Sequence, residues 1–243
     1  MQRRKKVLYE TKSPYGTYRV VDMTYDDRPA RVLFGDRNSP QSGMALDDNP
    51  ELIFDYNQRF LEIMHSIRPQ TVLVIGGGVG MLPTAAFHQF PNMTIDVVEI
   101  DETVVRIARD FFALPDDPRY TVHITDGLDF LRQAQGRYDM IILDAFLGYT
   151  IPHHLLTEEA VRLYRQFLSP HGVVAVNFIS EYRPRRRRLA HEIIDIFRTV
   201  FPEVALYQAD ASYRAGDEQN YILTASSRLR DFDYLQSTAR ELM

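Results

Sequence analysis

The stretch "TVLVIGGGVG", residues 71–80, decides the fold class of this chain. Its first five residues form an apolar run, which is typical of a strand buried on both faces of a sheet. Four glycines follow within five residues, and glycine lets a backbone turn sharply and lets a ligand come close. A buried strand that ends on such a turn and leads into a helix is typical of the ligand-binding edge of an α/β sheet.

The residues that follow repeat this strand–helix alternation to the end of the chain. The pattern predicts a doubly wound, mostly parallel seven-stranded sheet with helices on both faces. Apolar runs predict strands at 71–75, 94–100, 120–124, 138–144, 173–179, 204–209 and 220–226. Helical spacing predicts helices at 81–88, 102–112, 128–133, 158–168 and 185–200.

The residues before this alternation predict a smaller unit. Three β-rich runs, at 6–11, 17–25 and 30–35, are separated by turn signals and indicate an antiparallel β-unit within residues 1–48. Asn49-Pro50 then precedes a helix expected from about 51 to 67, which opens the second domain, residues 49–243.

Composition excludes several classes of protein. The 243 residues contain no cysteine, which rules out disulfides and cysteine–zinc sites and fits a cytoplasmic location. We see no signal peptide, and no apolar run approaches the roughly 18 residues needed to span a bilayer. A formal net charge of −5 argues against nucleic acid as the main partner. Two adjacent histidines in the loop after residue 144, His153 and His154, could line the pocket, but they are expected to be exposed and not to hold a metal.

The ends of the predicted strands supply the candidate site, because such sheets bind ligands at the carboxyl edge. The glycine turn lacks the Gly-Lys-Ser/Thr ending of a phosphate-binding loop, and Met81 replaces the small residue of the dinucleotide fingerprint. What is left is Gly76, Gly78 and Gly80 in a G-x-G-x-G pattern that suits a nucleoside without phosphates. A tight turn with no ligand is the alternative.

Two carboxylates strengthen the nucleoside interpretation. Glu99 ends the second predicted strand about 20 residues after the glycines, where a ribose-binding acid belongs. Asp126, followed by Gly127, ends the third strand and could accept a hydrogen bond from an adenine amino group or cap the next helix. Asp101 and Thr157 are expected helix caps. An acidic pocket of this kind suits an adenosyl sulfonium such as S-adenosylmethionine or its decarboxylated form.

At this point the chain resembles the spermidine synthase family. The resemblance rests on "VLVIGGGVG", "VVEID", "DPRYTVHITDGLDFL" and "YDMIILDAF", and on "YGTYRVVD" and "SPQSGMALDD" further upstream. It covers residues from about Tyr9 to Ser226. It implies a Rossmann-like methyltransferase fold and the transfer of an aminopropyl group from decarboxylated S-adenosylmethionine to a small-molecule amine, with no metal.

The resemblance also implies roles for individual residues. Gln41 and Tyr56 would line the donor and amine pocket, Glu99 would hold the ribose, and Asp126 would meet the adenine. Asp144 would accept a proton from the attacking ammonium or orient it, because an amine attacks only when neutral. The β-unit would help to form a homodimer.

Two departures from the family pattern leave the acceptor open. The family usually carries an acid inside the glycine motif, where this chain has Val79, and a second acid after Asp144, where it has Leu147. Each missing carboxylate removes a partner for an ammonium group. An S-adenosylmethionine-dependent methyltransferase on the same scaffold, and a non-catalytic nucleoside-binding protein, are therefore kept as alternatives.

Overall fold

The computed structural model describes residues 5–47, 52–148, 150–181, 188–210 and 218–228, and these form two sheets. The N-terminal sheet is antiparallel, with strand order β1-β2-β3-β4. Its strands are β1 (Lys6–Ser13), β2 (Gly16–Tyr25), β3 (Arg28–Phe34) and β4 (Pro40–Ala45). The last strand, which carries Gln41, was not predicted from the sequence, because its residues show no clear alternation of apolar and polar side chains. It forms by pairing with β3.

The main sheet has seven strands in the order β10-β11-β9-β8-β5-β6-β7, which confirms the predicted fold class. Neighbouring strands from β9 to β7 run parallel, and β11 is antiparallel to both β9 and β10. The strands are β5 (Thr71–Ile75), β6 (Thr94–Glu99), β7 (Tyr120–Ile124), β8 (Tyr138–Leu143), β9 (Leu168–Glu181), β10 (Glu203–Gln208) and β11 (Glu218–Ser226).

Helices cover both faces of this sheet, as a doubly wound topology requires. One face packs against α1 (Asp55–Ile67) and α2 (Met81–Gln89), with α3 (Glu102–Phe111) beside them over β6 and β7. The other packs against α4 (Gly127–Gln133), α5 (Glu158–Phe167) and α6 (Arg188–Arg198). None of the described helices is long and apolar enough to cross a membrane.

Helix starts follow the predicted capping residues, with one correction. Asp101 caps α3 by accepting from the Thr103 amide, and Thr157 caps α5 by accepting from the Ala160 amide. Helix α1 was predicted to begin at about residue 51 but begins at Asp55, because Leu52 instead bridges to Met44 of β4. The predicted start of α6 at 185 lies outside the described residues.

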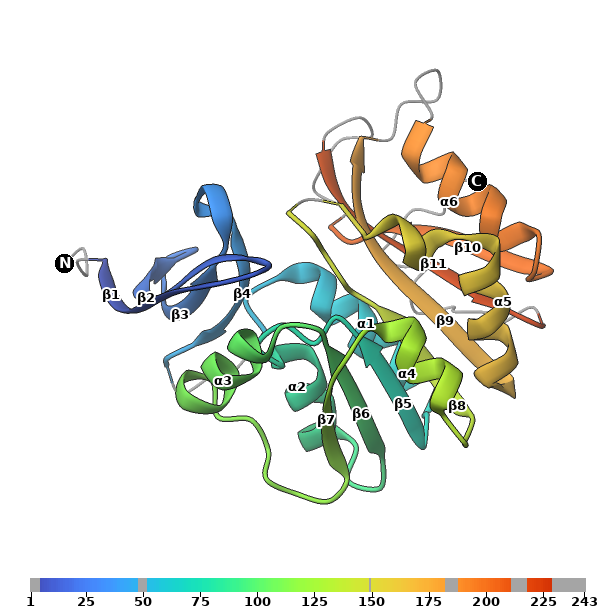
Figure 1. Ribbon diagram of the computed structural model, residues 1–243, viewed down its shortest axis with the longest axis horizontal. Coiled ribbons are helices and arrows are strands. Elements are labelled where there is room, and N and C mark those ends of the chain that lie inside the picture. Colours follow the sequence, from blue (N-terminus) through green and yellow to red (C-terminus); the bar gives the residue numbers. More distant parts are fainter. Residues whose placement is uncertain (1–4, 48–51, 149, 182–187, 211–217, 229–243) are drawn as a thin grey trace.

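The N-terminal sheet rests on α3 and on the glycine turn (Figure 1). Ser13 donates to the Asp101 carboxylate at 2.5 Å, and the Arg31 guanidinium donates to the Phe111 carbonyl at 3.0 Å. The Tyr9 ring stacks on Phe111 with 5.5 Å between centroids. The small sheet is thereby fixed beside the carboxyl edge of β5 and β6, where the candidate site lies.

Candidate functional site

The site forms where the strand order reverses, between β5 and β8. Both strands end there, and their backbones approach closely: the Asp144 amide donates to the Ile75 carbonyl at 2.8 Å. Gly76 has a φ of +90°, and a Cβ on it would lie 2.4 Å from the Ala145 Cα. Only glycine allows this approach, which sets the glycine turn directly beside Asp144. Ligands of open α/β sheets bind at this kind of reversal.

Asp144 is the acid at this reversal, and it is half-buried. Asn177 of β9 donates from Nδ2 to Oδ1 of Asp144 at 2.8 Å. Burial raises the pKa of Asp144 to about 7, although the hydrogen bond from Asn177 works in the opposite direction. Asn177 is 1% exposed, and its Oδ1 has no hydrogen-bond partner among the described residues. Asp144 and Asn177 together therefore supply a titratable carboxyl and an acceptor, Oδ1 of Asn177, that has no partner among the described residues.

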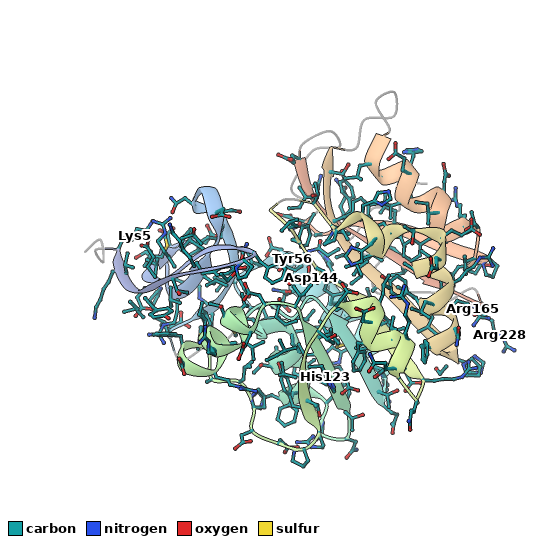
Figure 2. The ribbon with its side chains drawn as sticks, in the orientation of Figure 1. Lys5, Tyr56, His123, Asp144, Arg165 and Arg228 are labelled. Atoms are coloured by element: carbon teal, nitrogen blue, oxygen red, sulfur yellow. The ribbon has the colours of Figure 1, made fainter. Side chains whose placement is uncertain are left out.

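Tyr56 reaches this acid from the first turn of α1. Figure 2 shows Tyr56 and Asp144 beside one another, close to where the two sheets meet. Burial raises the pKa of the Tyr56 hydroxyl well above its usual value, and the charge of Asp144 raises it further. The ring also stacks on Phe54 with 6.1 Å between centroids. The structure thus brings together the two residues expected to be catalytic.

Glu99 ends β6 and holds the glycine turn from the side. The Gly78 amide donates to Oε2 at 2.8 Å, and the Asp101 amide donates to Oε1 at 3.0 Å. Burial raises the pKa of Glu99, and the hydrogen bonds from these two amides offset part of that rise. A carboxylate offers about four lone-pair positions, and the amides of Gly78, Asp101 and Ile100 use only part of them, so Glu99 can still accept from a ligand.

The remaining glycines have two different roles, room for a ligand and close packing. Gly78 has a φ of +50°, and a Cβ on it would meet nothing within 4 Å, so its surroundings are open to a ligand. Gly80, with a φ of +77°, packs under Leu114, whose Cδ2 would lie 2.3 Å from an added Cβ. Gly127 is buried and packs against Ile75 in the same manner, at 2.5 Å. Gly80 and Gly127 are therefore explained by packing.

Asp126 caps α4, one of the two roles that the sequence left open. Oδ1 accepts from the amides of Leu128 and Asp129, at 2.9 and 3.3 Å. Oδ2 lies 2.8 Å from Nε2 of His154, in the short 3-10 helix η2 (His153–Leu156). Burial raises the pKa of Asp126, but the hydrogen bonds from His154 and the two amides outweigh it and leave the pKa below its usual value.

The side chain of Gln41 packs on Gly35, and the side chain of Val79 is buried. Gln41 sits on β4 over Gly35, and in the described part of the chain it makes no hydrogen bond to Asp144 or Glu99. Val79 is fully buried in an apolar cluster that joins β2 and β3 to α3. The side chain at position 79 therefore points into the interface between the sheet and α3.

Asn177 was missed from the sequence, whereas His154 was weighed as a residue that could line the pocket. Asn177 could have been noticed as a single polar residue within the apolar run "VVAVNFI". His154 is exposed, as expected for this loop, and it also bonds to Asp126. Nowhere in the described ranges do three or more His, Cys, Asp or Glu side chains gather so that they could hold a metal ion.

Comparison with known proteins places this geometry in context. A family model described as "Spermine/spermidine synthase domain" matches residues 59–211. A polyamine aminopropyltransferase of Vibrio vulnificus is 36% identical over 121 residues, 49% of this chain and 40% of that protein. The eEF1A lysine and N-terminal methyltransferase of Homo sapiens is 32% identical over 173 residues, 66% of this chain and 22% of that protein. The chain thus spans less than half the length of these two curated relatives.

Solved structures show the same fold. The crystal structure of a probable spermidine synthase from Corynebacterium glutamicum superimposes with a TM-score of 0.80 at 21% identity, covering 93% of this chain and 82% of that one. Human Methyltransferase-like protein 13 in complex with SAH gives a TM-score of 0.62 at 24% identity, covering 75% of this chain and 88% of that one.

Proposed function

The chain belongs to the spermine/spermidine synthase family, and we propose that it transfers an aminopropyl group from decarboxylated S-adenosylmethionine to the nitrogen of an amine. The observation that carries this proposal is the Asp144–Asn177 pair. A carboxyl with a pKa of about 7 can take a proton from an ammonium group at neutral pH. The unused Oδ1 of Asn177 can accept a further N–H.

The proposed reaction begins with a proton transfer at the carboxyl edge of the sheet. Asp144 accepts one proton from the bound ammonium, and Tyr56 contacts the same nitrogen. The neutral amine then attacks the carbon beside the sulfonium, so that a carbon–nitrogen bond forms and a carbon–sulfur bond breaks. The electron pair of the broken bond neutralises the sulfonium, and methylthioadenosine leaves. No external oxidant or metal is needed for the balance.

The donor would lie along the glycine turn. Glu99 can still accept from a ribose hydroxyl, and the open surroundings of Gly78 leave room for the nucleoside. Gly76 and Gly80 shape the turn, and Asp126 and Gly127 set the far end of the pocket for the adenine. Gln41 would contact the donor from β4, but no contact in the described chain supports that role.

A specific observation favours methyl transfer as a second candidate. Val79 occupies the position where the family usually carries an acid for the amino group of the donor, and it is buried in an apolar cluster. A donor whose tail ends in an ammonium would then lack a carboxylate partner at this position. S-adenosylmethionine also carries a carboxylate on its tail, and a relative named as a methyltransferase matches 66% of this chain.

Calorimetry with the two donors, followed by mass analysis of the products, separates these functions. We expect decarboxylated S-adenosylmethionine to bind at least about tenfold more tightly, which corresponds to about 1.4 kcal/mol. With a small diamine as acceptor, we expect methylthioadenosine and an amine heavier by one aminopropyl group. Tighter binding of S-adenosylmethionine, with S-adenosylhomocysteine as product, would establish the methyltransferase instead. Homodimer formation and a cytoplasmic location stay predictions.

A further inference from the structure

His154 and Asp126 form a pair that the proposed chemistry does not use. His154 comes from η2, in the connection between β8 and α5, and Asp126 from the end of β7. Nε2 of His154 lies 2.8 Å from Oδ2 of Asp126. The imidazole therefore links the connection after β8 to the start of α4.

The geometry defines the tautomer of His154. The carboxylate of Asp126 can only accept hydrogen bonds, so Nε2 carries the hydrogen that joins the pair. In the neutral imidazole, Nδ1 is then an unprotonated acceptor. Within the described residues Nδ1 has no hydrogen-bond partner, and the His154 side chain is 52% exposed. An acceptor of fixed orientation is thus available to a ligand.

The same contacts leave Asp126 poorly suited to bind adenine itself. Its Oδ1 is shared by two amides at the start of α4, and its Oδ2 is occupied by His154. Two exposed apolar side chains stand at the neighbouring strand ends, Ile100 just after β6 and Ile124 at the end of β7. They offer apolar surface of the kind on which a purine ring packs, at the same carboxyl edge of the sheet.

We infer that Nδ1 of His154 accepts a hydrogen bond from the 6-amino group of the adenine ring, and that Asp126 is a positioning residue that orients the imidazole. The inference rests on the proposed function, because it requires an adenosyl ligand at this edge. It makes His154 the residue that distinguishes a 6-amino purine from a purine without that group.

A ligand-by-residue cycle tests the inference. The affinity of methylthioadenosine is compared by calorimetry with that of its analogue lacking the 6-amino group. Wild type is expected to favour the amino compound roughly three- to tenfold, the usual range for one hydrogen bond. His154→Phe should bind both compounds equally. His154→Gln can donate to Asp126 and still present an oxygen acceptor, so it should restore the preference.

His153→Phe is the matched control, because it makes the same change at the adjacent exposed histidine and should leave the preference as in wild type. If the role of His154 were purely structural, His154→Phe would weaken the binding of both compounds equally, and the ratio of their affinities would stay as in wild type. An unchanged or larger ratio in His154→Phe would show that Asp126 or another group holds the amino group, and would overturn the inference. A wild-type protein that binds neither compound would overturn the proposed function together with the inference.

Discussion

Asp144 shows at the scale of one residue how burial prepares a group for chemistry. An aspartate in water is ionised at neutral pH and is a weak base. Burial at the end of β8 raises its pKa to about 7, so the protonated and ionised forms are both populated near neutrality. Asn177 orients one carboxyl oxygen and leaves the other to a ligand. Burial thus gives this carboxyl the basicity that proton transfer from an amine needs.

We predict that Asp144→Asn lowers turnover by about 10²–10⁴-fold, the usual loss when a general base is removed. The amide keeps the shape of the side chain and can still accept from Asn177. Donor affinity should change much less, because Glu99 and the adenine end of the pocket are untouched. Turnover and donor affinity are measured on one preparation, and near-normal turnover would remove Asp144 from the mechanism.

Asp144 also predicts how stability depends on pH. Its pKa is higher in the folded protein than in the unfolded chain, so between about pH 4 and 7 the folded state holds a proton that the unfolded state has released. Its contribution to stability is therefore full below about pH 4 and falls as pH rises to about 7, by at most about 4 kcal/mol. Asp144→Asn removes this loss and should be the more stable protein at pH 8.

Urea unfolding of wild type and Asp144→Asn at pH 5 and pH 8 measures this effect. The difference in unfolding free energy between the two proteins should grow in favour of the variant as pH rises. An equal change with pH in both proteins would mean that the pKa of Asp144 is not raised.

At the scale of elements, the turn between β5 and α2 depends on a side chain from β6. Glu99 accepts from the amides of Gly78 and Asp101, so it ties the glycine turn to the start of α3. The same carboxylate is the proposed ribose ligand. The conformation of the turn and the affinity for the nucleoside are therefore coupled through one residue.

We predict that Glu99→Ala weakens methylthioadenosine binding by roughly ten- to a hundredfold, because hydrogen bonds to a charged acceptor contribute about 1.5–3 kcal/mol. The two amides also lose their acceptor, so unfolding free energy should fall by about 1–3 kcal/mol. Glu102→Ala is the control, because it removes the same charge from an exposed position three residues away. A folded Glu99→Ala protein with wild-type affinity would contradict the ribose role.

At the scale of the whole molecule, the N-terminal sheet and the glycine turn share one apolar interface. Val79 packs there with Tyr18, Val20 and Leu33 of the small sheet and with Val104 of α3. Val79 is a buried interface residue at this place, although its motif position suggested contact with the donor. Restoring the family's acid would put an unpaired carboxylate into this interface.

We predict that Val79→Asp lowers the free energy of unfolding by about 3 kcal/mol or more and does not tighten the binding of decarboxylated S-adenosylmethionine. Val79→Ala is the control for lost volume and should cost about 1–2 kcal/mol. Chemical denaturation and calorimetry measure the two quantities. A stable Val79→Asp protein with higher donor affinity would place this side chain in the ligand pocket.

The sequence by itself determined the layers of the fold and the edge at which to look for the site. Apolar runs at strand length, helical spacing and capping residues such as Asp101 and Thr157 act over a few neighbouring positions, so they can be read without tertiary contacts. These local signals predicted the doubly wound sheet and placed Glu99, Asp126 and Asp144 at strand ends. The domain boundary at residue 48 stays a prediction, because residues 48–51 lie outside the described chain.

The tertiary structure alone decided which of these side chains meet. Asn177 reaches Asp144 across 33 positions of the sequence, and His154 reaches Asp126 across 28. Such contacts depend on strand order and on the path of the connecting loops, neither of which leaves a periodic signal in the sequence. The burial of Val79 likewise follows from where the N-terminal sheet docks. Local patterns record secondary structure, whereas the environment of a side chain depends on residues distant along the chain.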